Sequence, residues 1–259
     1  MPIINGMGRW GVKAKSSTSN NGIVTSGLIL NLDAGNTNSY VSGSATWNDI
    51  SGYGNNGTLI NGPIFNSANN GYIRCDGYDD YISIPNTPLL KFGSSNFTVE
   101  YWFRKLNTTT GWDDIWGPNA WFSGGLPGAN EWTLTIGNGN GGEGNNISFG
   151  VEVGTTTYGT PYSTTQLSLN TWYQLVGVRE GGSLKVYLNS VLNMSTNPVG
   201  FTSSSVINNV PGRDIRLGNS GWNRFYTRVD NSQLRIYNKA LSAAEIQQNY
   251  NATKTRYGL

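Results

Sequence analysis

The chain has 259 residues, a formal net charge of +2 and no histidine. A net charge this small gives no strong electrostatic preference for nucleic acid. The missing histidine excludes Ser-His-Asp and Cys-His nucleophilic sites and histidine-ligated zinc.

Length and aromatic content favour one well-packed all-β domain. Charged residues make up only 12% of the chain, and nine Trp and 14 Tyr can fill a sizeable core. No apolar run is long enough to cross a membrane. The first residues, MPIINGMGRWGVKAK, lack an apolar core of signal-peptide length, so we expect no export by the general route.

Residues 1–26 differ from the rest of the chain. They carry basic but no acidic residues, followed by SSTSNNG, which predicts an extended basic arm with a flexible joint. The alternative is a frayed terminus. If the arm docks on a partner, the anchoring candidates are Ile3, Ile4, Arg9, Trp10, Lys13 and Lys15.

From residue 27 onward the apolar residues recur with a period of two. Such alternation is typical of strands with one buried face, and Gly/Asn/Ser turns between them predict an antiparallel two-sheet sandwich. We expect Asn189-Ser190 to form a two-residue hairpin turn and Cys75 to be a buried strand residue. The alternating segments are 28–32, 82–84, 97–103, 132–136, 147–153, 184–188 and 234–236.

One segment has a helical pattern. Ser242 precedes Glu245 by three residues in LSAAEIQQNY, which is the spacing of a capping box. We predict a helix over about 243–250, too short to be stable alone, that packs on the sandwich through Leu241, Ile246 and Tyr250. Residues 251–259 are assigned to a C-terminal tail.

The Gly- and Asn-rich segment 47–63, WNDISGYGNNGTLINGP, is interpreted as framework rather than as a ligand loop. Asp49 and Asn55 can bond the local backbone, and its glycines permit tight turns. Trp47 and Leu59 are expected to fix its ends to the core.

Several segments together resemble a concanavalin A-like, laminin-G-like domain of the type found in tailed-bacteriophage virion structural proteins. They are GLILNLDAGN, WNDISGYGNNGTLINGP, YIRCDGYDDYISIP, FTVEYWFR, NTWYQLVGVREGGSLKVYLNSVL and VDNSQLRIYNKALSAAEIQQNY. The resemblance covers residues 27–250 and implies an all-β, two-sheet antiparallel jelly roll with one short C-terminal helix. The ends, MPIINGMGRWG and YNATKTRYGL, also resemble those of such phage proteins.

The sequence departs from this family at two points. Ser190 stands where relatives usually have glycine, which leaves the type of hairpin turn open. The enzymes that share the fold carry paired carboxylates on one strand, whereas Glu100, Glu131 and Glu152 have no second carboxylate at i+2 or i+4. Glycoside hydrolysis needs two carboxyls about 5 Å or about 6.5–9.5 Å apart, so we expect no enzyme.

Asp76, Asp79 and Asp80 in CDGYDDYIS form a candidate calcium site, because calcium takes six to eight oxygen ligands. The favoured alternative is a tight turn in which Asp side chains accept hydrogen bonds from the backbone. At least one of these carboxylates is then expected to face a backbone N–H group.

The stretch TGWDDIWGPNAWF contains Trp112, Asp113, Asp114, Trp116 and Trp121. Tryptophan faces and carboxylates suit a sugar, in which the rings stack and the hydroxyls are bonded. The same residues suit a protein interface or packing of the loop on its own domain, and these alternatives stay open.

From this resemblance we expect a non-enzymatic bacteriophage virion protein, a surface-exposed capsid decoration anchored by its terminal arm or tail. Its partners would be other virion proteins in a symmetric homo-oligomeric position, and it would be assembled in the cytoplasm of the bacterial host. The alternative is a lectin-like module of a tail or fibre that binds host-surface glycans. Neither hypothesis involves nucleic acid or a membrane.

Overall fold

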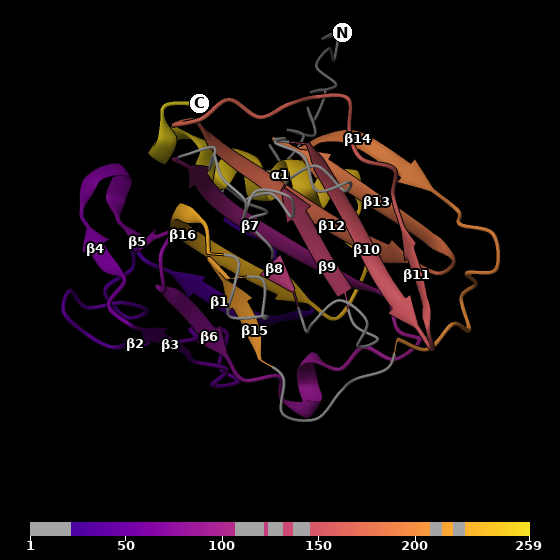
Figure 1. Ribbon diagram of the computed structural model, residues 1–259, viewed down its shortest axis with the longest axis horizontal. Helices are drawn as coiled ribbons and strands as arrows, with labels where there is room; N and C mark the ends of the chain where they lie inside the picture. Colours follow the sequence, from indigo (N-terminus) through magenta and orange to yellow (C-terminus); the bar gives the residue numbers. More distant parts are fainter. Residues whose placement is uncertain (1–21, 107–121, 124–131, 137–145, 208–213, 220–225) are drawn as a thin grey trace, which may run out of the picture.

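The structure, a computed structural model, describes residues 22–106, 122–123, 132–136, 146–207, 214–219 and 226–259, and it contains two packed antiparallel sheets (Figure 1). We call them the helix-covered sheet and the opposing sheet. The helix-covered sheet runs β14 (Val191–Thr196), β13 (Ser183–Leu188), β12 (Trp172–Glu180), β7 (Phe97–Lys105), β16 (Arg228–Tyr237), β5 (Tyr72–Asp76), β4 (Ile64–Asn66), with β1 (Leu28–Asp33) also paired to β16.

The opposing sheet also has eight strands. Their order is β11 (Thr156–Gly159), β10 (Ile147–Val153), β9 (Trp132–Ile136), β8 (Phe122–Ser123), β15 (Ile215–Leu217), β6 (Tyr81–Ile84), β3 (Gly57–Ile60), β2 (Thr46–Trp47). Two short 3-10 turns, η1 (Ala68–Asn70) and η2 (Pro88–Leu90), connect strands. The all-β sandwich predicted from the alternating pattern is therefore confirmed.

The main core lies between the two sheets and is built from the apolar members of each alternating segment. Phe97 of the helix-covered sheet contacts Phe149 of the opposing sheet, with ring centroids 5.8 Å apart. Gly177 on β12 faces the same ring, and a Cβ there would lie 2.5 Å from the Phe149 Cδ2 atom. Cys75 is fully buried in β5 as predicted, and burial raises the pKa of its thiol.

The framework interpretation of segment 47–63 agrees with the structure. The Asp49 carboxylate accepts hydrogen bonds from the backbone N–H groups of Asn31, Ser51 and Asn55 at 2.8–2.9 Å. The Asn55 amide donates to the Ile29 carbonyl at 3.0 Å, and Trp47 is fully buried. This segment is held to the sandwich by its own polar side chains.

The hairpin between β13 and β14 turns at Asn189-Ser190, as predicted. Both residues have positive φ, 48° and 66°, as a type I′ turn requires. Serine replaces the usual glycine here, and its hydroxyl donates to the Gln247 side chain at 3.0 Å. The turn is thereby linked to the C-terminal helix.

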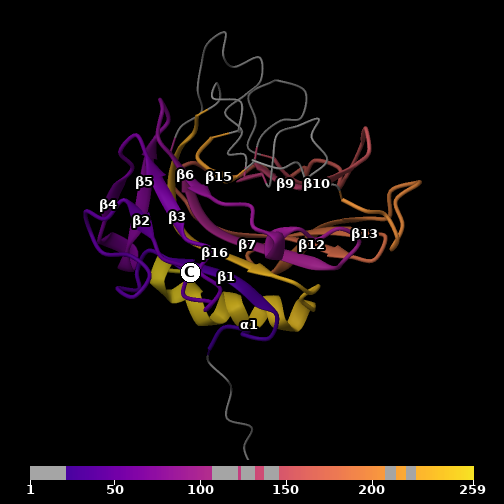
Figure 2. The ribbon, with the colours of Figure 1, turned by 90° about the horizontal axis from the view of Figure 1, so that it is seen from below.

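The helix α1 (Ala243–Thr253) lies on the outer face of the helix-covered sheet, away from the opposing sheet (Figure 2). The capping box is present, with Ser242 and Glu245 bonding each other's backbone N–H groups. Leu241 and Ile246 are buried and Tyr250 stacks on Trp102, as predicted. No helix in the described part of the chain is long and apolar enough to cross a membrane.

The C-terminal residues and the first described residues are packed on the domain more closely than the sequence indicates. The helix continues three residues beyond Tyr250 because no glycine or proline interrupts it, and η4 (Lys254–Tyr257) follows. Tyr257, in the segment assigned to a tail, is buried and stacks on Trp102 with ring centroids 4.5 Å apart. At the other end, the Val24 N–H donates to the Asn249 side chain at 2.7 Å.

A buried carboxylate connects the helix to the sheet. Glu100 on β7 is 1% exposed and accepts hydrogen bonds from Arg235 at 2.9 Å, Gln174 at 3.0 Å and Asn249 at 2.6 Å. Arg235 and Gln174 come from the strands on either side of β7, and Asn249 comes from α1. A carboxylate can be buried at this depth only because its charge is paired and hydrogen-bonded.

We predict that Asn249→Ala lowers the free energy of unfolding by about 2–4 kcal/mol, because it leaves a Glu100 oxygen and the Val24 N–H without this partner. Urea denaturation measures the change. Asn251→Ala, an exposed position on the same helix whose side chain accepts a hydrogen bond from the exposed Gln247 amide, is the control and should change stability by less than about 0.5 kcal/mol. Equal effects of the two substitutions would contradict the importance of the buried contact.

Candidate functional site

The β3–β4 turn, residues 61–63, separates a surface pocket from the acidic turn that the sequence analysis singles out. The Asn61 side-chain amide donates to the Asp79 carbonyl at 2.9 Å. Gly62 lines the pocket, and a Cβ there would lie 3.9 Å from an Asp80 carboxylate oxygen. The two features are therefore parts of one continuous surface at the end of the sandwich.

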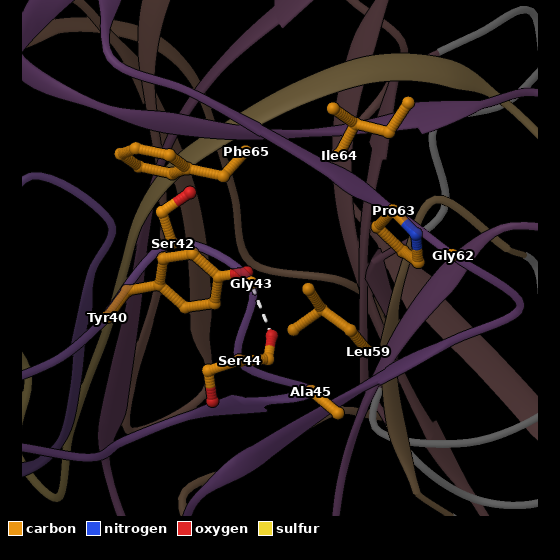
Figure 3. Close-up of a pocket in the computed structure, with 10 residues that line it drawn as sticks. All are labelled: Tyr40, Ser42, Gly43, Ser44, Ala45, Leu59, Gly62, Pro63, Ile64 and Phe65. Carbon is orange, nitrogen blue, oxygen red and sulfur yellow. Dashed lines mark hydrogen bonds between the residues drawn. The ribbon is translucent and has the colours of Figure 1, made fainter.

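The pocket is a cavity of about 390 Å³ (Figure 3). Its walls come from the loop that precedes β2 and from the turn and strand that follow β3. The lining residues are Tyr40, Ser42, Gly43, Ser44, Ala45, Leu59, Gly62, Pro63, Ile64 and Phe65. A concave, largely apolar surface with a few hydroxyl groups is typical of small-ligand sites.

Two aromatic rings form one end of this pocket. Tyr40 and Phe65 pack with ring centroids 5.3 Å apart, and the Tyr40 hydroxyl donates to the Ser44 carbonyl at 2.8 Å. Burial raises the pKa of the Tyr40 hydroxyl above its ordinary value. Phe65 is only partly buried, and Ser42 and Ile64 are exposed at the rim.

No local motif predicts this pocket. Leu59, Gly62 and Pro63 belong to segment 47–63, which the sequence indicates as framework, so the end of that segment also lines the pocket. Tyr40 and Phe65 are far apart in the sequence and each belongs to a short polar loop or edge strand. The weak alternation of apolar and polar residues around 59–65 indicates a strand and does not indicate a pocket. The pocket exists because β4 and the loop before β2 lie at the same end of the sandwich.

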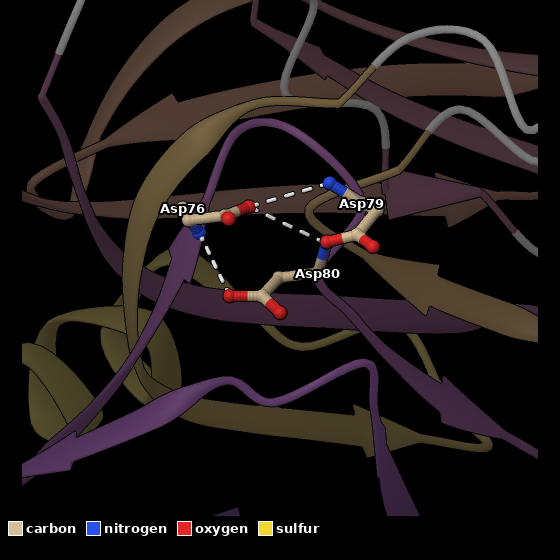
Figure 4. A group of neighbouring side chains, drawn as sticks. All are labelled: Asp76, Asp79 and Asp80. Atoms are coloured by element: carbon tan, nitrogen blue, oxygen red, sulfur yellow. Dashed lines mark hydrogen bonds between the residues drawn. The ribbon is translucent and has the colours of Figure 1, made fainter.

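The three acidic side chains of the turn after β5 do come together (Figure 4). One carboxylate oxygen of each lies within 4.8 Å of the others. The Asp76 carboxylate accepts hydrogen bonds from the backbone N–H groups of Tyr78, Asp79 and Asp80 at 2.7–3.4 Å, and Asp80 accepts one from the Asp76 N–H at 3.1 Å. The expected contact with backbone donors is confirmed, and calcium binding stays a prediction.

Asp80 is the buried member of this group, with an exposed fraction of 5%. Burial raises the pKa of its carboxyl, the hydrogen bond from Asp76 opposes that rise, and the charges of Asp76 and Asp79 add to it. The ionised form of Asp80 is therefore less favourable in the folded protein than in the unfolded chain.

The remaining predicted site residues lie outside the described part of the chain. They are the aromatic and acidic stretch at 112–121 and the arm residues 3–15. Both stay predictions. Glu131, one of the three glutamates without a nearby second carboxylate, also lies outside the described residues. The other two, Glu100 and Glu152, lie within them.

Glu100 and Glu152 lie far from each other. Glu100 is buried beneath α1 on the outer face of its sheet, and Glu152 alternates with core residues on the outer face of β10, where Thr157 donates to it at 3.4 Å. The two carboxyls lie on the outer faces of two sheets that pack about 10 Å apart. They therefore do not form the closely spaced pair of carboxyls that a retaining hydrolase needs.

Comparison with known proteins gives the family to which this fold belongs. A laminin-G-like family model described as "Concanavalin A-like lectin/glucanases superfamily" matches residues 76–247. No curated protein sequence matches the chain.

Several solved structures share this architecture. The binding domain of Paraclostridial Mosquitocidal Protein 1 has a TM-score of 0.66 at 16% identity, over 87% of this chain and 52% of that chain. The binding domain of Botulinum Neurotoxin DC in complex with SialylT has a TM-score of 0.61 at 14% identity, over 88% and 52%. The chain thus spans about half the length of these toxin domains.

A third structure is matched over nearly its whole length. It is domain 4 of AbnA, a GH43 extracellular arabinanase from Geobacillus stearothermophilus, in complex with arabinotriose. The TM-score is 0.61 at 16% identity, over 86% of this chain and 98% of that chain. At such identities the likeness shows the fold alone.

We predict that Asp80→Asn raises the melting temperature at pH 7. The raised pKa of Asp80 means that its ionisation opposes folding above the folded-state pKa, whereas the neutral acid below the unfolded value of about 3.9 carries no such penalty. The difference between variant and wild type should therefore shrink as the pH falls through that range.

Thermal unfolding between pH 3 and pH 7 tests this pH dependence. Glu152→Gln on β10 is the control, because β9, β8 and β15 lie between β10 and β6, which follows Asp80. A destabilised Asp80→Asn variant at pH 7 would contradict the prediction, since it would mean that the charge itself stabilises the turn.

Proposed function

Because the chain belongs to the concanavalin A-like lectin/glucanase superfamily, we propose that it is a non-catalytic domain that binds carbohydrate. The observation that carries the proposal is the pocket of about 390 Å³ in which an aromatic pair meets a loop of small hydroxyl-bearing residues. An aromatic face can stack on the apolar face of a sugar ring, while hydroxyl and backbone groups bond the ring's own hydroxyls.

The pocket suggests how a sugar would be oriented. The partly buried Phe65 offers a ring face, and the exposed Ile64 extends the apolar surface at the rim. Ser42 supplies an exposed hydroxyl on the opposite loop. The Tyr40 hydroxyl is bonded to Ser44, so its contribution is to fix the loop that carries these groups.

The solved neighbours support binding rather than catalysis. The arabinanase domain is named in complex with arabinotriose, and the match covers 98% of its length, so the likeness concerns a whole domain. One toxin domain is named in complex with SialylT. We extend carbohydrate binding from these proteins to this chain as a proposal, without bond cleavage.

One further part of the proposal rests on the sequence alone. Trp112, Trp116 and Trp121, with Asp113 and Asp114, are a second candidate surface for a glycan or a protein partner. Calcium bound by the acidic turn is not part of the proposed mode of binding, since three backbone N–H groups already bond one Asp76 carboxylate oxygen, Oδ1.

We also propose, as a second function, that the domain is a component of a bacteriophage virion, with capsid decoration ahead of a tail or fibre position. The support is the resemblance of the sequence to phage structural proteins and the position at which an arm would start. Val24 is bonded to Asn249 and Tyr237, so a longer arm would extend from the helix-covered side toward other virion subunits. Carbohydrate binding and a virion position are compatible.

We predict that Phe65→Ala weakens glycan binding at least tenfold, because it removes the ring face of the pocket, whereas Phe65→Trp retains binding. A glycan array that includes arabino-oligosaccharides identifies the ligand, and calorimetry in CaCl2 and in EDTA measures its affinity. The two buffers should give the same Kd, and no reducing sugar should be released.

Tyr162→Ala removes a partly exposed ring that does not line the pocket and should bind as wild type does. Trp112→Ala tests the second candidate surface in the same assay. Binding of no glycan on the array, or unchanged affinity of Phe65→Ala, would count against the pocket as the site. Sustained release of reducing sugar would overturn the non-catalytic proposal.

We predict that deletion of residues 1–21 abolishes incorporation into virions without lowering the melting temperature. The deletion ends before Val24, whose backbone contacts with α1 and Tyr237 are part of the folded domain. Quantification of the protein in purified particles is the measurement. A variant with Arg9, Lys13 and Lys15 changed to Ser keeps the arm's length and tests its charge, and normal incorporation of the deleted protein would refute the anchoring role.

A further inference from the structure

One row of side chains crosses the outer face of the helix-covered sheet, over β12, β7, β16, β5 and β4 (Figure 1). Cross-strand pairing sets its order, which is Trp172, Arg104, Asp230, Arg74 and Ile64. We call it the arginine row. The side chains of Arg74 and Arg104 are 33% and 20% exposed, and Ile64 is 69% exposed. The row is therefore open to a partner from outside.

The two arginines of this row share one acid. Arg74 donates from Nε and Nη2 to the two Asp230 oxygens at 2.7 and 3.1 Å, and Arg104 donates from Nε to Oδ2 at 2.8 Å. Every other ion pair of the described residues joins one acid to one base. Arg228 and Asp76, which face each other in the next row, add one charge of each sign. The arginine row thus has one positive charge in excess.

Buried aromatic rings hold the two guanidinium groups in place. The Cζ atoms of Arg74 and Arg104 lie 5.5 and 5.2 Å from the centroid of the Tyr72 ring, and that of Arg104 lies 5.0 Å from the Trp172 ring. Tyr72 and Trp172 are themselves buried and pack edge to face. A guanidinium that is stacked and paired before binding loses little side-chain freedom when a ligand arrives.

Both arginines keep N–H groups that the folded domain does not use. Within the described ranges, no hydrogen bond engages the Nη1 atom of Arg74 or of Arg104, and neither atom is fully buried. The Nη2 atoms of both residues lie within 3.1 Å of Asp230 Oδ2. The two guanidinium groups are therefore close enough for the two oxygens of one further carboxylate to reach both.

The excess charge selects a single carboxylate. Carboxylate oxygens only accept hydrogen bonds, as the free N–H groups require, and one carboxylate cancels one positive charge. A phosphate monoester, with a charge of about −1.5 to −2, would exceed that excess and would face the Asp230 and Asp76 carboxylates. The exposed Ile64 at the end of the row adds an apolar contact, which favours an acidic residue within a protein over a free anion.

We propose that the arginine row is a docking surface for an acidic protein partner, with one Asp or Glu carboxylate of the partner bound between Arg74 and Arg104. The Phe65 pocket is lined by neither arginine and shares only Ile64 with the row. The proposal therefore does not depend on carbohydrate binding.

Titration of the ¹⁵N-labelled full-length protein with the capped peptide acetyl-Leu-Glu-Leu-amide tests the proposal. We expect saturable chemical-shift changes at the backbone amides of residues 73–75, 103–105 and 229–231. The matched peptide acetyl-Leu-Gln-Leu-amide, which has no charge, should bind at least tenfold more weakly. Added NaCl should weaken binding of the acidic peptide, because the arginines are partly exposed.

Arg74→Gln should abolish these shift changes, and Arg228→Gln is the matched control. It removes the same charge from an exposed arginine in the next row and should bind as wild type does. Arg74→Lys keeps a positive charge beside Asp230, so it preserves the fold if Arg74→Gln does not. It lacks the paired N–H groups of a guanidinium and should bind at least fivefold more weakly.

Four results would overturn the proposal. They are the absence of saturable changes at these amides with the acidic peptide, equal affinity for the two peptides, and an unchanged Kd in folded Arg74→Lys. The fourth is tighter binding of inorganic phosphate than of acetate at the same amides, which would assign the row to a phosphate group.

Discussion

The packing of α1 on the helix-covered sheet depends on the buried ion pair and hydrogen bonds of the Glu100 carboxylate. It lies 1% exposed between β7 and α1, and it accepts hydrogen bonds from Gln174, Arg235 and Asn249. Three separate parts of the chain must be in place to satisfy it. A buried charge without partners is strongly destabilising. The Glu100 carboxylate therefore couples the position of the C-terminal helix to the register of β7, β12 and β16.

The coupling continues from the helix to the chain ends. The Asn249 side chain donates its amide N–H to Glu100 and accepts the Val24 N–H with its carbonyl oxygen, so α1 fixes the position of Val24. From Arg235 the contacts run through Gln233 and Asp33 to Arg256, which also bonds the backbone of η1.

The candidate pocket differs in physical character from the polar network under α1. The Phe65 pocket is mainly apolar and aromatic and lies at an end of the sandwich, beside an acidic turn in which backbone donors bond the Asp76 carboxylate. In the proposed function this pocket would select a ligand by the shape of a ring face. The lining residues of the pocket include no carboxylate.

Features with local geometry can be predicted from the sequence. A period of two predicts β1, β6, β7, β9, β10, β13 and β16, whereas the other strands of the described residues carry no such clear alternation. The Ser242–Glu245 spacing predicts the helix start, and Asn189-Ser190 predicts a hairpin turn. Which distant residues meet depends on the tertiary structure: Glu100 with Arg235, Tyr40 with Phe65, and Tyr257 with Trp102. Hydrogen bonds and ring contacts act over a few ångströms, so they depend on strand order and register, which no single segment encodes.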